Sequence, residues 1–179
     1  HGTSRGLGDV YKRQDFIRYY LASKLSAGVD DLDMDLNDFQ KKVNTDLVGK
    51  FINIASRSQG FLKKDNNTLS EALDNEIIEE FIDEKDNIFK LFIAREYSKA
   101  VKEIMLLADK ANQYIDLNKP WELNKEETNS KEVKKIASTA INLFRILNLY
   151  LEPVIPETSE KIKNYLKSNQ SLDDLSTCL

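Results

Sequence analysis

The segment "LNDFQKKVNTDLVGKFINIASRSQGF", residues 36–61, repeats apolar side chains at intervals of three and four residues. The series consists of Leu36, Phe39, Val43, Leu47, Phe51 and Ala55. Because an α-helix has about 3.6 residues per turn, this spacing gathers the apolar side chains on one face and predicts an amphipathic helix of about five turns. We expect the helix to end near Gly60, acting as a C-terminal cap.

The same segment carries Asn53 and Arg57 one helical turn apart. Asn53 lies about 200° around the helix from Phe51, on the side that also holds Asp46 and Lys50. We therefore expect Asn53 and Arg57 to face away from the bundle core. Such residues are most often ordinary surface groups, so the pair alone does not establish a binding site.

Helical periodicity continues along nearly the whole chain. It predicts one helix over residues 76–88 and a long one that carries Ile93, Tyr97, Val101, Ile104, Ala108, Ala111 and Ile115. The long helix must stop before Pro120, because the residue preceding a proline avoids the α conformation. Two more helices are expected, over residues 131–151 and from Pro156 onward. With no alternating strand pattern, the sequence predicts an all-α fold, a monomeric bundle of about five or six helices.

Composition narrows the class of protein. Of 179 residues, 41% are hydrophobic and 31% charged, as in ordinary soluble domains. The net charge of −4 argues against a protein that binds nucleic acid without sequence preference, since such binding depends on neutralising many phosphates. No apolar run approaches the roughly 20 residues of a membrane span, and no leader is apparent, so we expect a cytoplasmic protein without membrane contact.

Metal and nucleophilic chemistry have little support. The one cysteine, Cys178, and the one histidine, His1, stand at opposite ends of the chain, so we expect neither a metal site nor a catalytic unit built on them. Runs of acidic residues are expected to form solvated faces. Residues 1–14, "HGTSRGLGDVYKRQ", show no periodicity and hold three of the six glycines. We expect them to be a disordered arm or a sequence added by cloning or assembly.

The stretch "NKPWELNK", residues 118–125, contains the only tryptophan, Trp121. A single tryptophan in a helical bundle more often lies in the core. Here Pro120 restrains the backbone after a helix end, and a rigidly held aromatic ring is a good platform for an unpaired base. An amide such as Asn53 pairs with base edges, and a guanidinium such as Arg57 binds phosphate or stacks. Periodicity does not establish that the three side chains meet.

At these residues the chain resembles the methionyl-tRNA synthetases, class I aminoacyl-tRNA synthetases, in their anticodon-binding domain. The resemblance covers residues 15–166. Four segments carry it in the family order: "DFIRYYLASKLS", "DLDMDLNDFQKKVNTDLVGKFINIASRSQGF", "REYSKAVKEIMLLADKANQYIDLNKPWELNK" and "INLFRILNLYLEPVIPETSEKI". It implies a helix leaving the catalytic half at residues 15–30, the anticodon-binding bundle at 31–168 and a C-terminal tail at 169–179.

The resemblance also implies a site. In the family, the Asn and Arg of an N-x-A-S-R motif and the Trp of a P-W motif hold the anticodon of methionine tRNA. The matching residues here are Asn53, Arg57 and Trp121, with Pro120 shaping the loop and Asn112 close by. One departure is Gly49, at a place one turn before the motif asparagine where family members can carry a polar residue.

The family's catalytic signatures, H-I-G-H and K-M-S-K-S, are absent from this sequence. The chain thus looks like the recognition part alone, with no catalytic residue, metal or cofactor of its own. ATP, magnesium and, in many members, zinc would act in the full-length enzyme, on the N-terminal catalytic half. Two alternatives stay open: the anticodon-binding domain of an isoleucine, valine or cysteine synthetase, and a helical protein-interaction module.

Overall fold

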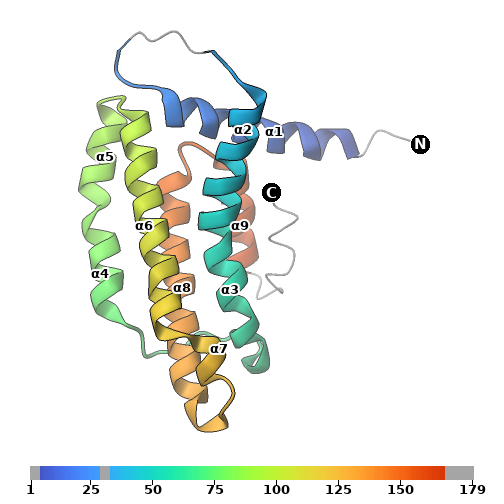
Figure 1. Ribbon diagram of the computed structural model, residues 1–179, viewed down its shortest axis with the longest axis vertical. Helices are drawn as coiled ribbons and strands as arrows, with labels where there is room; N and C mark the ends of the chain where they lie inside the picture. Colours follow the sequence, from blue (N-terminus) through green and yellow to red (C-terminus); the bar gives the residue numbers. More distant parts are fainter. Residues whose placement is uncertain (1–4, 29–32, 168–179) are drawn as a thin grey trace.

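The computed structural model describes residues 5–28 and 33–167, and for residues 5–13 it describes the backbone alone. Regular structure in these ranges is entirely helical, which confirms the predicted all-α bundle. The long helices stand side by side as rods, and the first helix, drawn in blue, lies across their upper end (Figure 1). The helices are α1 (Arg5–Lys24), α2 (Leu36–Val43), η1 (Asn44–Ile52), α3 (Asn53–Leu62), η2 (Lys63–Asp65), α4 (Asn75–Asp83), α5 (Lys85–Ile93), α6 (Tyr97–Asn118), α7 (Pro120–Leu123), η3 (Glu127–Asn129), α8 (Ser130–Leu151) and α9 (Pro156–Lys167).

Several helical segments join end to end into longer rods. α2, η1 and α3 follow one another without a gap, and α4 and α5 are separated only by Glu84. Together with α1, α6, α8 and α9, they give six rods within the described residues. This number agrees with the five or six helices that the periodicity predicts.

A side-chain hydrogen bond sets the start of the rod formed by α2, η1 and α3, and a left-handed residue sets its end. Asp35 caps its start, because its carboxylate accepts a hydrogen bond of 2.8 Å from the backbone N–H of Asn37. The predicted end at Gly60 is wrong, since helix continues through η2 as far as Asp65. It stops at Asn66, whose φ of 53° is left-handed, a conformation that asparagine adopts more readily than most residues.

The core lies where this rod and α6 pack against α8. Phe51 is fully buried, and its ring stacks on Phe144 of α8 with 4.7 Å between ring centroids. The predicted apolar face is buried at Val43, Leu47, Phe51 and Ala55. Leu36 is 73% exposed instead, because it lies in the first turn of the rod, beyond the core.

Two helix boundaries differ from the prediction. The helix expected over residues 76–88 consists of α4 and α5, and α5 extends to Ile93. Ile93 therefore does not begin the long helix, and it is 70% exposed. The break between α5 and α6 contains Arg95, whose φ of 61° turns the chain. α6 ends at Asn118, as Pro120 predicts, and α8 and α9 begin at Ser130 and Pro156, within a residue of expectation.

α1 begins at Arg5, so residues 5–14, which we expected to be a disordered arm or an added sequence, are helical. Residues 1–4 and the predicted tail at 169–179 lie outside the described residues. From Asp15 the helix is tied to the bundle: the buried Asp15 carboxylate accepts a hydrogen bond of 2.7 Å from the backbone N–H of Thr158 in α9. Arg18 donates to the carbonyl oxygen of Val154 at 3.2 Å.

Candidate functional site

The candidate site begins at a change in helix type. η1 is π-helical, and the backbone N–H of Asn53 donates to the carbonyl oxygen of Val48, five residues earlier. π-helical turns are wider than α-helical turns and often occur at functional sites. Gly49 lies in this stretch, where a Cβ would stand 3.3 Å from the carbonyl oxygen of Asn44. A larger residue at position 49 would therefore require a small backbone shift.

The rod and α6 run in the same direction and lie side by side (Figure 1). Three polar pairs connect them, and the partners in each pair are 59 residues apart: Lys50 with Asp109, Asn53 with Asn112, and Arg57 with Asp116. A constant offset is what two parallel helices in register produce. The site is therefore built between two rigid rods.

Asn112 is the centre of the polar group. Its carboxamide oxygen accepts from Nδ2 of Asn53 at 3.1 Å and from Nη1 of Arg57 at 3.4 Å. Its Nδ2 donates to the carbonyl oxygens of Lys50 and Ala108, each at 3.0 Å. These bonds fix the orientation of the carboxamide, so Asn53 and Arg57 are held by a side chain that is itself held.

Arg57 connects this group to Trp121. Its Nη2 forms an ion pair with Asp116, and its guanidinium carbon lies 5.5 Å from the centroid of the Trp121 ring. That distance falls within the range of cation–π contacts. Trp121 is 42% exposed, so much of this large apolar ring faces solvent.

The backbone around Trp121 is fixed by the end of α6. Lys119 adopts a left-handed φ of 44°, and its N–H donates to the carbonyl oxygen of Ile115 at 3.0 Å. Pro120 is buried and starts α7, where its ring fixes φ at a helical value. Trp121 follows in the same turn, and α7 packs against α8. The turn is therefore restrained on both sides, as the sequence predicts.

The structure brings all five predicted residues into one corner between α3, α6 and α7. Asn53 and Arg57 were expected to face away from the bundle core; they are half-buried, on the side of α3 that packs against α6. The apolar face of one helix predicts one buried side, whereas α3 packs against both α8 and α6. Asp116 was missed, although its place one turn after Asn112 on the same helix was a usable signal.

Asp46 also lies differently from the expectation. It is only 4% exposed, accepts a hydrogen bond of 2.7 Å from the Tyr19 hydroxyl and pairs with Lys42 at 2.9 Å. Burial, followed by the nearby Asp46 carboxylate, raises the pKa of Tyr19 far above its usual range. Asp46 therefore joins the rod to α1, and its carboxylate is paired and nearly buried.

Metal-binding clusters and membrane-spanning helices are both absent from the described ranges. Among the side chains that the structure describes, those of residues 14–28 and 33–167, no group of three or more His, Cys, Asp or Glu is placed to hold a metal ion. None of the helices described there combines the length and the apolar character that crossing a membrane requires.

Two family models match the chain. Residues 64–177 match the anticodon binding domain of methionyl tRNA ligase, and residues 7–59 match the class I tRNA synthetases (M). Asn53 and Arg57 lie in the second match, whereas Asn112, Pro120 and Trp121 lie in the first. The candidate site is therefore assembled from both matched regions, and the second match begins before the boundary that we expected at residue 15.

Two curated relatives of the chain are both methionine–tRNA ligases. The methionine–tRNA ligase of Dichelobacter nodosus is 46% identical over 166 residues, and that of Vesicomyosocius okutanii is 46% identical over 162 residues. These alignments cover 91% and 89% of this chain but 25% and 30% of the relatives. The chain thus spans less than a third of their length.

Solved structures share the fold. Mycobacterium tuberculosis methionyl-tRNA synthetase bound by methionyl-adenylate superposes with a TM-score of 0.74 at 23% identity, covering 93% of this chain and 35% of that one. Its apo form gives a TM-score of 0.73 at 24% identity, covering 90% and 34%. At this identity the likeness shows the fold alone. The family model matches residues 64–177, which is more than half of the chain, so the chain belongs to the family of methionyl-tRNA ligase anticodon-binding domains.

Proposed function

We propose that the corner formed by Asn53, Arg57, Asn112, Pro120 and Trp121 recognises the anticodon of methionine tRNA. The observation that carries the proposal is that an exposed tryptophan, restrained in its turn, stands beside a guanidinium and two amides that are already oriented. A protein that selects its RNA by unpaired bases needs such a combination of a stacking ring and fixed polar groups.

The roles follow from the contacts of each residue. The Trp121 ring stacks on a splayed-out base. Asn53 uses one amide N–H on Asn112, which leaves its second N–H and its oxygen without a bonded partner among the described residues and available to a base edge. The ion pair with Asp116 offsets the charge of Arg57, so we assign Arg57 to base contact and stacking and not to phosphate.

We further propose that this recognition serves a longer protein that ligates methionine to its tRNA in the cytoplasm. The curated relatives, both methionine–tRNA ligases, are three to four times as long as the matched region. ATP, magnesium and, in many members, zinc belong to the remaining part in this proposal. The chain described here is assigned RNA recognition alone.

The test is a chimera in which this chain follows a complete catalytic half of a methionine–tRNA ligase. Its binding to RNA stem-loops with a CAU anticodon and with the first base changed is compared by fluorescence anisotropy of labelled RNA. Trp121→Ala is expected to weaken binding by about 1–3 kcal/mol. Asn53→Ala and Arg57→Ala should each reduce discrimination between the two RNAs by about 1–3 kcal/mol.

Ser56→Ala is the matched control, because Ser56 lies on the same helix between Asn53 and Arg57 but is exposed. It should leave binding and discrimination unchanged. The proposal fails if the unmodified chimera does not distinguish the two stem-loops. It also fails if Trp121→Ala keeps full discrimination.

A further inference from the structure

The candidate site is the lower end of a longer polar seam between two rods. The rod contributes Lys42, Asp46, Lys50, Asn53 and Arg57, at spacings of four, four, three and four residues. α6 contributes Ser98, Lys102, Met105, Asp109, Asn112 and Asp116, at alternating spacings of four and three. Both series follow one helix face, so the side chains of the site and those above it line the same seam.

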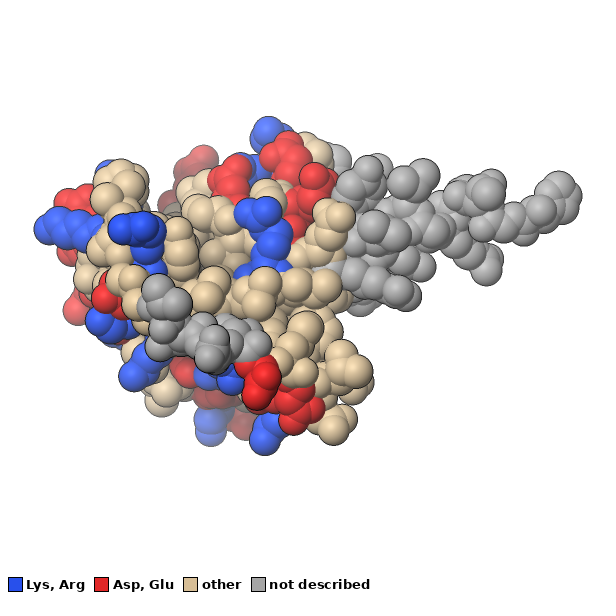
Figure 2. Space-filling view, turned by 90° about the horizontal axis from the view of Figure 1, so that it is seen from above, with Lys and Arg blue, Asp and Glu red and all other residues tan. Residues whose placement is uncertain are grey.

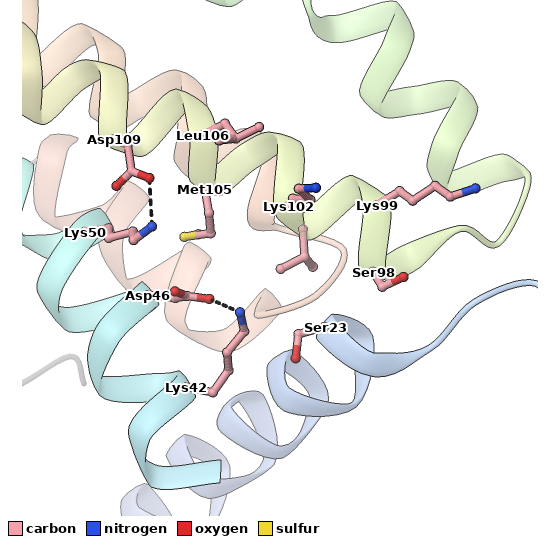
Figure 3. Close-up of a pocket in the computed structure, with 11 residues that line it drawn as sticks. Ser23, Lys42, Asp46, Lys50, Ser98, Lys99, Lys102, Met105, Leu106 and Asp109 are labelled. Carbon is pink, nitrogen blue, oxygen red and sulfur yellow. Dashed lines mark hydrogen bonds and ion pairs between the residues drawn. The ribbon is translucent and has the colours of Figure 1, made fainter. Parts of the chain in front are cut away.

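The upper end of the seam opens into a pocket of about 370 Å³ between α1, α2, η1 and α6 (Figure 3). Its polar lining consists of Ser23, Lys42, Asp46, Lys50, Ser98, Lys99, Lys102 and Asp109. In Figure 3, Lys42 extends to Asp46 and Lys50 to Asp109, and both carboxylates are thereby paired.

The lining is basic although the chain is acidic. Four lysines and two aspartates line the pocket, an excess of two positive charges (4 − 2) in a chain of net charge −4. Lys99 is paired only with Glu96, at 3.3 Å, and Lys102 has no carboxylate partner among the residues that the structure describes. Figure 2 looks onto this end of the molecule, where basic and acidic groups are otherwise interspersed. Three of these four ammonium groups are ion-paired, and within the described ranges Lys102 carries the charge that no carboxylate offsets.

The distance between the pocket and the candidate site corresponds to a few nucleotides of a nucleic-acid strand. Lys102 and Asn112 are ten residues apart on α6, which corresponds to about 15 Å along the helix axis. A nucleic-acid strand covers that distance in about four to five base-pair steps. Consider an RNA whose loop bases lie at Trp121 and whose strand follows the seam upward. The phosphates of its adjoining stem then lie near the pocket.

We propose that the pocket holds backbone phosphates of the stem that adjoins the anticodon loop, with Lys99 and Lys102 as the principal contacts and Lys42 behind them. This inference rests on the proposed function of the lower corner and adds to it. Phosphate contacts of this kind set position and affinity but do not read sequence. The corner would then select the RNA, and the pocket would orient its stem along α6.

The test compares a Lys99→Gln/Lys102→Gln variant with a Lys85→Gln/Lys90→Gln control. Both control lysines are exposed on α5, which lies on the other side of α6 from α3 (Figure 1). Lys42 is left unchanged, because its loss would leave the buried Asp46 without its cation. Two RNAs are titrated at several salt concentrations: a CAU stem-loop and a seven-nucleotide strand with the loop sequence alone.

The pocket variant should weaken stem-loop binding and reduce the slope of log K against log salt by about 1 for each phosphate that the variant no longer neutralises. Binding of the loop strand, and the preference for CAU over a changed first base, should stay as in the unmodified chain. The control variant should reproduce the unmodified chain with both RNAs.

Each other outcome has a distinct meaning. If the pocket variant equals the control, or weakens both RNAs alike, the pocket does not hold the stem and the inference is overturned. If the unmodified chain shows no preference for CAU, the proposed function of the corner fails. If the pocket variant still weakened stem-loop binding in that case, the result would support phosphate binding by the pocket independently of anticodon recognition by the corner.

Discussion

Replacing Asn112 by alanine tests whether one side chain organises the recognition corner. The substitution removes four hydrogen bonds: two that Asn112 accepts from Asn53 and Arg57, and two that it donates to the carbonyl oxygens of Lys50 and Ala108. The two accepted bonds, which hold the recognition corner together, set the minimum expected cost. At roughly 0.5–1.5 kcal/mol each, we expect a loss of about 1–3 kcal/mol in the free energy of unfolding.

Urea unfolding followed by circular dichroism at 222 nm measures this loss, and Gln113→Ala is the control. Gln113 is the exposed neighbour on α6, and its replacement should change stability by no more than about 0.5 kcal/mol. In the anisotropy assay with the chimera, Asn112→Ala should also lower discrimination between anticodons, because Asn53 and Arg57 lose their common anchor. Equal stability of the two variants, with discrimination intact, would refute the reasoning.

Three further outcomes are expected. Phe51→Ala should destabilise the bundle by about 3–5 kcal/mol, because Phe51 is fully buried on Phe144, whereas Val48→Ala on the exposed side should cost about 0.5 kcal/mol or less in the same urea assay. Although burial raises the pKa of Asp74, hydrogen bonds from Tyr114 and Lys135 outweigh it and lower that pKa below its usual value. The ionised Asp74 therefore stabilises the fold above the unfolded-state pKa, and this contribution is lost as pH falls through the lower folded pKa. Thermal melts from pH 7 to pH 2 should show a smaller acid-side loss for Asp74→Asn; identical pH profiles would contradict this. Methionine-dependent pyrophosphate exchange by the chain alone should stay at background, because the sequence contains neither H-I-G-H nor K-M-S-K-S.

Most of the fold follows from local sequence patterns. The α8 and α9 boundaries and the end of α6 were predictable, because an apolar repeat and prolines determine them within a few residues. The continuation of α3 past Gly60 was not, since a glycine inside a helix is tolerated when tertiary packing supplies the stability.

The candidate site was predictable in most of its members, Asp116 excepted, but not in its geometry. The motif resemblance supplied Asn53, Arg57 and Trp121, and periodicity placed the first two opposite Phe51. That α6 covers this side depends on how three helices pack, which no single helical pattern contains. The ion pair of Arg57 with Asp116 follows from the parallel register of the two rods, a relation between segments 59 residues apart.

An RNA base is proposed to stack on Trp121, and the chain supplies its own probe of this contact. Trp121 is the only tryptophan, so intrinsic fluorescence excited at 295 nm reports on this ring alone. Titration of the isolated chain at low salt with a CAU stem-loop should quench the emission in a saturable way, and the RNA with a changed first base should require a higher concentration. If anisotropy shows the CAU stem-loop bound while the Trp121 emission stays unchanged, the RNA binds elsewhere and the account is wrong.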